Sequence, residues 1–173
     1  MTALLTKGAS LSGPGAEDAA RHIVVEILSR RQASQAELVL SRPDAWRLFG
    51  MDIGTLREDC IPGLLLTDDH EQTHATLARQ SSFRRLLLIY DSEGADLPGG
   101  RVQIPLISIS PRIQGATRVS ADGAVTCTIA PSPTDRLPLL TRHDAFNLLM
   151  SMPTRARRHD ELDGTEEHTP HTP

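Results

Sequence analysis

Residues 64–91 constrain the fold of this chain more than any other stretch, because the spacing of their apolar residues changes along it. The leucine run Leu64–Leu66 is followed by Thr67 and Asp68, whose side-chain oxygens can cap a helix. A helix is therefore predicted over about 69–80. The run from Phe83 to Asp91 then predicts a strand that is apolar on both faces. A chain built in this way folds into a domain of mixed helices and strands.

Residues 17–32, EDAARHIVVEILSRRQ, predict an amphipathic helix. Apolar residues at positions 20, 23, 24, 27 and 28 form one stripe, and the acidic start and basic end suit the helix dipole. The helix could simply cover one face of the domain. Alternatively, it could pair two copies of the chain into a homodimer or link the domain to a signalling partner.

The stretch from Ser34 to Gly50 supports two local structures. Ser34 and Glu37 match a capping box and favour a helix, whereas 37–41 (ELVLS) also fits a short strand. Asp44 then fits the cap of a short helix that Gly50 ends. Two short helices could form a DNA-binding helix-turn-helix, but the acidic balance and the lack of a basic face argue against it.

Further strands are predicted over 101–110 and 124–130, the second after a turn at Asp122-Gly123. A capping box from Thr141 to Asp144 predicts a last helix that runs to about residue 152. The expected organisation is a flexible N-terminus over 1–16, a single domain over 17–152 and a disordered tail over 153–173.

Composition narrows the class of protein. The 173 residues fit one domain, and 23% charged residues are too many for a membrane protein. The net charge of −4 and only five aromatic residues argue against a nucleic-acid partner. The two cysteines, Cys60 and Cys127, are far apart and form no C-x-x-C motif. With no expected signal peptide or membrane span, we expect a cytoplasmic protein with no membrane partner.

A zinc-hydrolase motif lies within the predicted helix, because His70, Glu71 and His74 spell H-E-x-x-H. Two histidines four residues apart can bind one metal ion, and the glutamate can act as general base on metal-bound water. The flanks of the motif are polar, however, and it lacks an adjacent third ligand. The remaining candidates for that ligand are Glu93, Asp96 and His143. The simpler interpretation is two exposed histidines on a solvated helix, with no metal.

The order of elements resembles that of a PAS-type sensor domain over about 37–130. The residues that carry this resemblance are Asp68-Asp69 before a helix, Phe83 at the head of a strand, Glu93-Gly94, Ser108–Pro111 and the Asp122-Gly123 turn. The resemblance implies an α+β fold. In it, a small antiparallel sheet carries short helices on one face, and the amphipathic helix over 17–32 lies beside it.

The resemblance also bears on cofactors. Haem-binding relatives use a histidine on the corresponding helix, where His70 and His74 lie. Flavin-binding relatives carry a reactive cysteine near Cys60, but its surroundings, REDCIPG, lack the pattern of asparagine, arginine and glutamine expected there. The chain has one asparagine, Asn147, which lies outside the similar region. A flavin is therefore not expected, and haem and zinc remain alternatives to a protein without cofactor.

Three functions follow from these observations. The first is a non-catalytic regulatory module that acts through contacts with a protein partner, and that could be tuned by a small ligand. The second is a zinc hydrolase with His70 and His74 as ligands and Glu71 as catalytic base. The third is a structural component of a larger assembly.

Overall fold

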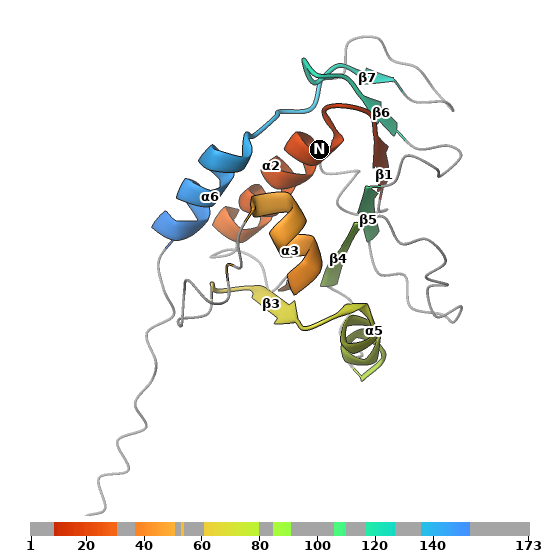
Figure 1. Cartoon of the computed structure of the whole chain (residues 1–173), viewed down its shortest axis with the longest axis vertical. Coiled ribbons are helices and arrows are strands. Elements are labelled where there is room, and N and C mark those ends of the chain that lie inside the picture. The colour runs from red at the N-terminus through yellow and green to blue at the C-terminus, as the bar shows by residue number, and fades with distance from the viewer. Residues whose placement is uncertain are drawn as a thin grey trace, which may run out of the picture.

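A computed structural model describes residues 9–30, 37–50, 53, 61–79, 85–90, 106–109, 117–126 and 136–152 of the chain. The helices of this part are α2 (Ala16–Ser29), α3 (Arg42–Phe49), α5 (His70–Arg79) and α6 (Arg142–Ser151). The strands are β1 (Ala9–Ser12), β2 (Glu37–Ser41), β3 (Leu64–Thr67), β4 (Arg85–Tyr90), β5 (Leu106–Ile109), β6 (Thr117–Val119) and β7 (Val125–Thr126). The predicted mixture of helices and strands is confirmed (Figure 1). None of the described helices is long and apolar enough to cross a membrane.

The described strands form one seven-stranded sheet in the order β3-β2-β4-β5-β1-β6-β7. Every pairing in it is parallel except the last, between β6 and β7. The expectation of a small antiparallel sheet was therefore wrong. The reason lies in short runs such as Leu38–Leu40 and Leu64–Leu66, which are apolar at every position rather than at alternate ones. Such runs are typical of parallel strands that are covered on both faces.

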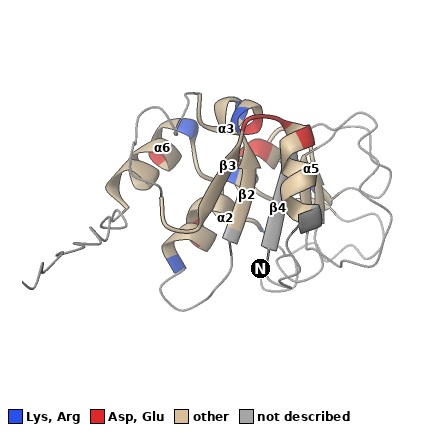
Figure 2. Ribbon diagram, turned by 90° about the horizontal axis from the view of Figure 1, so that it is seen from below, with Lys and Arg blue, Asp and Glu red and all other residues tan. Residues whose placement is uncertain are grey.

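Helices lie on both faces of the sheet (Figures 1 and 2). The face covered by α2, α3 and α6 holds the main core, which includes Leu38 and Leu40 of β2. α5 packs on β2 and β3 from the other face, where Val39 and Leu77 are buried outside that core. The expectation of helices on one face alone was therefore also wrong. Each chain crossover in a parallel sheet needs a covering segment, and crossovers that run in opposite directions use opposite faces.

The apolar stripe of α2 packs inside the protomer. Its residues Ala20, Ile23, Val24 and Leu28 are at most 5% exposed, and they lie in the core with strands β1, β2 and β5. The helix therefore covers one face of the domain, as the first of the two interpretations predicts. Pairing two copies through this stripe would require the core to open.

The predicted flexible N-terminus was wrong for residues 9–12, which form β1 near the middle of the sheet. β1 pairs with β5, with Leu11 opposite Ile109, and with β6, with Leu11 opposite Thr117. Leu11 is fully buried, but it is flanked by serines, so the sequence shows no apolar run at this place. Three-dimensional context therefore decides the structure of this segment. Residues 1–8 lie outside the described part.

Several local predictions agree with the structure. Residues 37–41 form a strand rather than a helix, and α3 ends at Gly50, whose φ is 78°. The helix predicted over 69–80 corresponds to α5, and the strand predicted over 83–91 corresponds to β4. Thr141 caps α6 by accepting a hydrogen bond from the backbone of Asp144.

Other predictions fall partly or wholly outside the described residues. Of the strand predicted over 101–110, the described part is β5, and of the strand over 124–130 it is β7. Gly123 has a φ of 84° in the turn before β7, as the Asp-Gly turn predicts. The proposed tail over 153–173 lies outside the described part.

Candidate functional site

The carboxyl ends of β2 and β3 bring together a buried carboxylate, Asp44, and a half-exposed histidine, His70. Ser41 ends β2 and lies in register with Thr67, which ends β3. From β2 the chain continues to β3, and from β4 it continues to β5, so the connections leave the neighbouring strands β2 and β4 in opposite directions. In open α/β sheets, ligands bind outside the carboxyl edge at such switch points.

Asp44 is a buried carboxylate at this edge, in the first turn of α3. Ser41 caps α3, because its Oγ accepts a hydrogen bond from the backbone N of Asp44 at 3.2 Å. The same hydroxyl donates to Oδ2 of Asp44 at 2.6 Å. Asp44 is 2% exposed, so its carboxylate is held by hydrogen bonds in place of water.

His70 is the second partner of this carboxylate. It is the first residue of α5, and its Nε2 lies 2.9 Å from Oδ2 of Asp44. An ionised carboxylate can only accept, so the bonded Nε2 is the donor, and in the neutral tautomer this leaves Nδ1 as the acceptor. The His70 side chain is 44% exposed, and no described residue bonds to Nδ1. The site therefore presents an oriented imidazole with one ring nitrogen available to a ligand.

The start of α5 is fixed by its own cap, which sets the position of His70. The backbone N of Gln72 donates to Oδ1 of Asp69 at 2.7 Å, and the backbone N of Asp68 donates to Oε1 of Gln72 at 2.5 Å. These reciprocal bonds resemble a capping box and satisfy donors that a helix start leaves unpaired.

Acidic residues dominate the charge of this edge. Figure 2 shows acidic ribbon where β3 passes into α5 and at the start of α3. Arg42 forms an ion pair with Asp68 at 3.2 Å, but both are solvent-accessible, so the pair is worth little. Helix starts commonly attract phosphate, but side-chain oxygens already cap both of these starts. The edge therefore suits a ligand with hydrogen-bond donors or a positive charge.

The H-E-x-x-H motif does not build a metal site in the described part of the chain. His70 Nε2 is bonded to Asp44, His74 lies one turn further on and is half-buried, and Glu71 is exposed. Within the described ranges, no group of three or more histidine, cysteine or acidic residues could hold a metal ion. His143 lies on α6, which packs on α2 and α3, and it bonds to Asn147. Glu93 and Asp96 lie outside the described residues, as do Cys60, Phe83 and Cys127.

Sequence reasoning missed Asp44 as the partner of His70, and Ser41 as the second partner of Asp44. Asp44 was interpreted as a helix cap, whereas Ser41 is the cap and Asp44 lies three residues later. The available signal was a Ser-x-x-Asp box directly after the apolar run 38–40. A second apolar run, 64–66, is followed by Thr67, Asp68 and Asp69. If the two strands are parallel, the two capped helix starts lie side by side.

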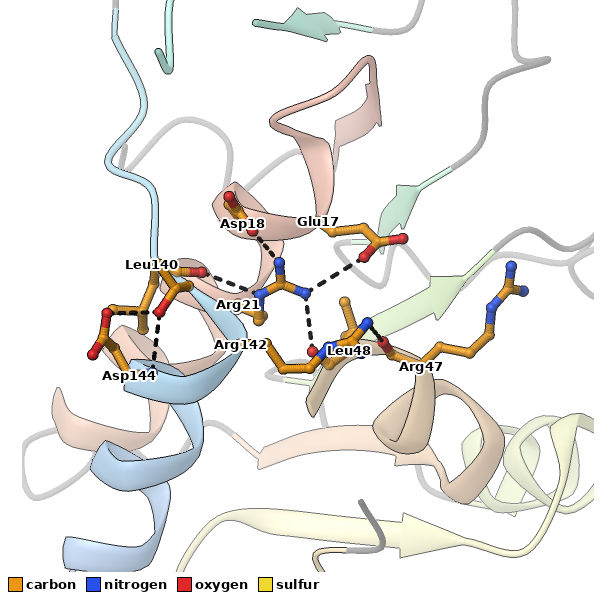
Figure 3. A network of polar contacts seen from close by, with 9 residues as sticks. Glu17, Asp18, Arg21, Arg47, Leu48, Leu140, Arg142 and Asp144 are labelled. Atoms are coloured by element: carbon orange, nitrogen blue, oxygen red, sulfur yellow. Dashed lines mark hydrogen bonds and ion pairs between the residues drawn. The ribbon is translucent and has the colours of Figure 1, made fainter. Parts of the chain in front are cut away.

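A second polar cluster surrounds Arg21 of α2 (Figure 3). The guanidinium is almost fully buried, and it donates to the backbone oxygens of Leu48, at 2.9 Å, and Leu140, at 3.1 Å. It also pairs with Asp18 and Glu17 on its own helix. All its described partners belong to the fold, so Arg21 joins α2 to the end of α3 and to the segment before α6.

The glycine-rich loop between β1 and α2 also serves packing. Gly13 has a φ of 90°, and a Cβ placed on it would lie 2.6 Å from the carbonyl oxygen of Val119. The backbone N of Gly15 donates to the same oxygen at 3.1 Å. These glycines let the loop approach β6 closely, so they need no phosphate ligand to explain them.

No family model matches this chain, and no curated protein or solved structure is similar enough to match it.

Proposed function

We propose that this chain is a non-catalytic regulatory domain that binds a small polar ligand at the carboxyl edge of β2 and β3 and acts through contacts with a protein partner. The observation that carries the proposal is the bond between His70 and buried Asp44 at the carboxyl edge of a parallel sheet, where β2 is also one of the two strands of the switch point. A half-exposed imidazole held by a buried carboxylate is a fixed hydrogen-bonding group at the place where such sheets bind ligands.

The arrangement of the hydroxyl group supports binding over nucleophilic catalysis. In a catalytic triad, the serine hydroxyl bonds to the histidine, and the carboxylate bonds to the other ring nitrogen. Here Ser41 and His70 both bond to Oδ2 of Asp44, so the hydroxyl points to the carboxylate. Ser41 is also 1% exposed, which leaves it poorly placed to attack a substrate.

The position of the site suggests how binding could reach a partner. Asp44 belongs to α3 on one face of the sheet, and His70 begins α5 on the other. A ligand on Nδ1 of His70 changes the charge distribution of the ring that joins these helices. Trp46 lies two residues from Asp44 and is 57% exposed, so α3 also presents an aromatic side chain of the kind enriched in protein interfaces.

Trp46 gives a direct test, because it is the only tryptophan in the chain. We would titrate the protein with ammonium compounds, polyols and inorganic phosphate while following tryptophan fluorescence. A saturable change with at least one ammonium compound or polyol is expected, and none with phosphate. The change should be lost in His70→Gln and retained in His143→Gln, which alters an exposed histidine on α6. Equal responses in the two variants, or no response to ammonium compounds and polyols, would contradict the proposal.

A general-base enzyme is the second candidate, because a carboxylate behind an imidazole also favours proton transfer. Compounds that bind in the titration would be followed by NMR for chemical conversion. The regulatory proposal predicts no turnover. Turnover that His70→Gln abolishes while binding persists would assign His70 to catalysis instead.

The zinc and haem alternatives are tested on the same sample. His70 uses Nε2 for Asp44, so we expect less than stoichiometric zinc by elemental analysis and no Soret absorption. Stoichiometric zinc that is lost in His74→Ala would restore the hydrolase hypothesis, and a Soret band would restore the haem hypothesis.

A further inference from the structure

Two buried threonines lie directly behind the candidate site. Thr67 ends β3 and Thr73 lies in the first turns of α5, and they are 3% and 1% exposed. Their hydroxyl oxygens are 2.5 Å apart. Oγ1 of Thr73 also lies 2.8 Å from the carbonyl oxygen of Asp69. The pair thus connects the end of a strand to the residue that precedes His70.

The distances favour one direction for the hydrogen bonds of this pair. A carbonyl oxygen can only accept, so the hydroxyl of Thr73 donates to Asp69 and accepts from Thr67. The carbonyl oxygen of Leu40, 3.4 Å from Oγ1 of Thr67, is a weaker alternative acceptor on β2. Buried hydroxyl groups need such partners, because an unpaired one loses its bond to water.

The start of α5 is ordered by its own cap and contacted by Arg42 and Asp44 of α3, but few buried contacts hold it on the sheet. Among the described side chains of this helix, Leu77 is the buried hydrophobic one, and it lies near the other end. The turn that carries His70 is otherwise solvent-exposed at Asp69, His70 and Glu71. On α5, the bond of Thr73 to Thr67 is therefore the buried contact nearest in sequence to His70.

We infer that Thr73 is a positioning residue for His70: its hydroxyl, bonded to Thr67 on β3 and to Asp69 before His70, ties the helix start to the sheet so that Nε2 of His70 meets Asp44. The importance of Thr73 for ligand binding rests on the proposed function. The positioning itself is a property of the ligand-free protein, and it can be measured there.

The test uses NMR of the His70 ring nitrogens, which distinguishes the Nε2–H form from the Nδ1–H form. In the wild-type protein at neutral pH, the Nε2–H form is expected. Thr73→Val removes the hydroxyl and keeps the side-chain shape, and it should convert His70 to a mixture of the two forms. Thr73→Ser restores the hydroxyl and should restore the wild-type spectrum. Thr76→Val, on the same helix, is the matched control and should leave His70 unchanged.

A merely structural role would lower the melting temperature in Thr73→Val while leaving the ring of His70 in the Nε2–H form. That result would overturn the inference, and so would an equal effect of Thr76→Val. If Thr73→Val does not fold, Thr67→Val removes the donor on the strand side. It should produce the same change at His70, and an unchanged ring there would also overturn the inference.

The two proposals fail separately. A changed His70 ring in Thr73→Val, together with no ligand response in the wild-type protein, would keep the positioning role and remove the proposed function. A ligand response that depends on His70 but persists unchanged in Thr73→Val would do the opposite.

Discussion

The bond between His70 and Asp44 joins a half-exposed imidazole to a carboxylate that is 3% exposed. Burial makes this carboxylate depend on its two hydrogen-bond donors, Ser41 and His70. Removing the charge leaves a weaker acceptor for both donors, because bonds to ionised groups are the stronger ones. The exposed acids of the same edge have water as an alternative partner.

Asp44→Asn should therefore destabilise the fold by about 1–3 kcal/mol, the cost of disturbing buried hydrogen bonds to a charged group. The measurement is urea unfolding at neutral pH. Asp68→Asn is the control, because Asp68 is 74% exposed, and its loss should cost less than about 1 kcal/mol. Equal costs for the two variants would show that the buried carboxylate contributes nothing particular to stability.

Asp122 gives a prediction about pH. A hydrogen bond from the Ser120 hydroxyl, followed by one from the backbone of Ala124, lowers the pKa of this exposed carboxyl below its usual value. Burial opposes the shift slightly, and Arg136 at 3.2 Å adds to it. A carboxyl whose pKa is lower in the folded state stabilises the fold above its unfolded pKa, about 3.9, and this stabilisation is lost as pH falls through the folded pKa.

Asp122→Asn should therefore melt at a slightly lower temperature than the wild-type protein at pH 7. The difference should shrink as pH falls below about 4, where the unfolded chain binds a proton at this carboxyl before the folded protein does. Thermal unfolding followed by circular dichroism across this range measures both. A difference that stays constant with pH would mean that the ionised form of Asp122 contributes nothing.

At the scale of elements, α2 is held by one buried guanidinium. Arg21 supplies donors to the backbone of Leu48 and Leu140, and the backbone N of Leu140 donates to Asp18 in return. These bonds join three segments that are distant in sequence (Figure 3). The planar guanidinium makes several of them at once, which a lysine ammonium cannot reproduce.

Arg21→Met should cost about 3 kcal/mol, because it leaves buried carbonyl oxygens without donors. Arg21→Lys should recover part of this loss. Arg30→Ala serves as control, since the Arg30 side chain is 72% exposed in its pair with Glu26, and it should change stability by less than about 1 kcal/mol. Chemical denaturation of the three variants measures these differences, and a methionine variant as stable as wild type would refute the role of Arg21.

The loop before α2 makes a steric prediction. A Cβ on Gly15 would clash with the backbone oxygen of Ser120 and lie 3.1 Å from Val119 Cγ1. Gly15→Ala should therefore cost about 2–3 kcal/mol by overpacking. Pro14→Ala, at an exposed neighbour, should cost at most about 1 kcal/mol. If Gly15→Ala is as stable as the wild-type protein in unfolding experiments, the close approach of Gly15 to β6 is not needed.

Sequence signals predicted elements well where an apolar run or a helix cap was clear. β4, α5 and α6 fall within one or two residues of their expected bounds. β1 escaped prediction because a four-residue strand with one large apolar side chain carries no period of its own. At the site, His70 stood out through its motif, but its partner Asp44 is 26 residues away, and no local pattern pairs them.

At the scale of the whole molecule, strand direction was the main error. Apolar runs locate strands but do not say which strands are neighbours or how they run. The clue was that the runs 38–40 and 64–66 are apolar at every position, which indicates strands covered on both faces. The resemblance to a sensor domain outweighed this clue and favoured antiparallel pairing.

Burial of α2 predicts the association state. Ile23 is 2% exposed inside the core, so Ile23→Ala should lower the stability of the protomer by about 2–5 kcal/mol. It should not change the mass measured by light scattering, and the melting temperature should not depend on protein concentration. A wild-type dimer that this variant dissociates would instead place the α2 stripe at an interface between copies.

The central position of β1 also has a consequence for how the chain folds as it is made. Ala9–Ser12 leave the ribosome well before their partners on both sides, β5 and β6, which follow roughly 100 residues later. Contacts between such distant segments slow folding, because a long loop must close before they form. β1 must therefore wait, unpaired, until most of the sheet has been synthesised, and a segment with so few apolar residues lacks the apolar composition that is typical of aggregation-prone strands.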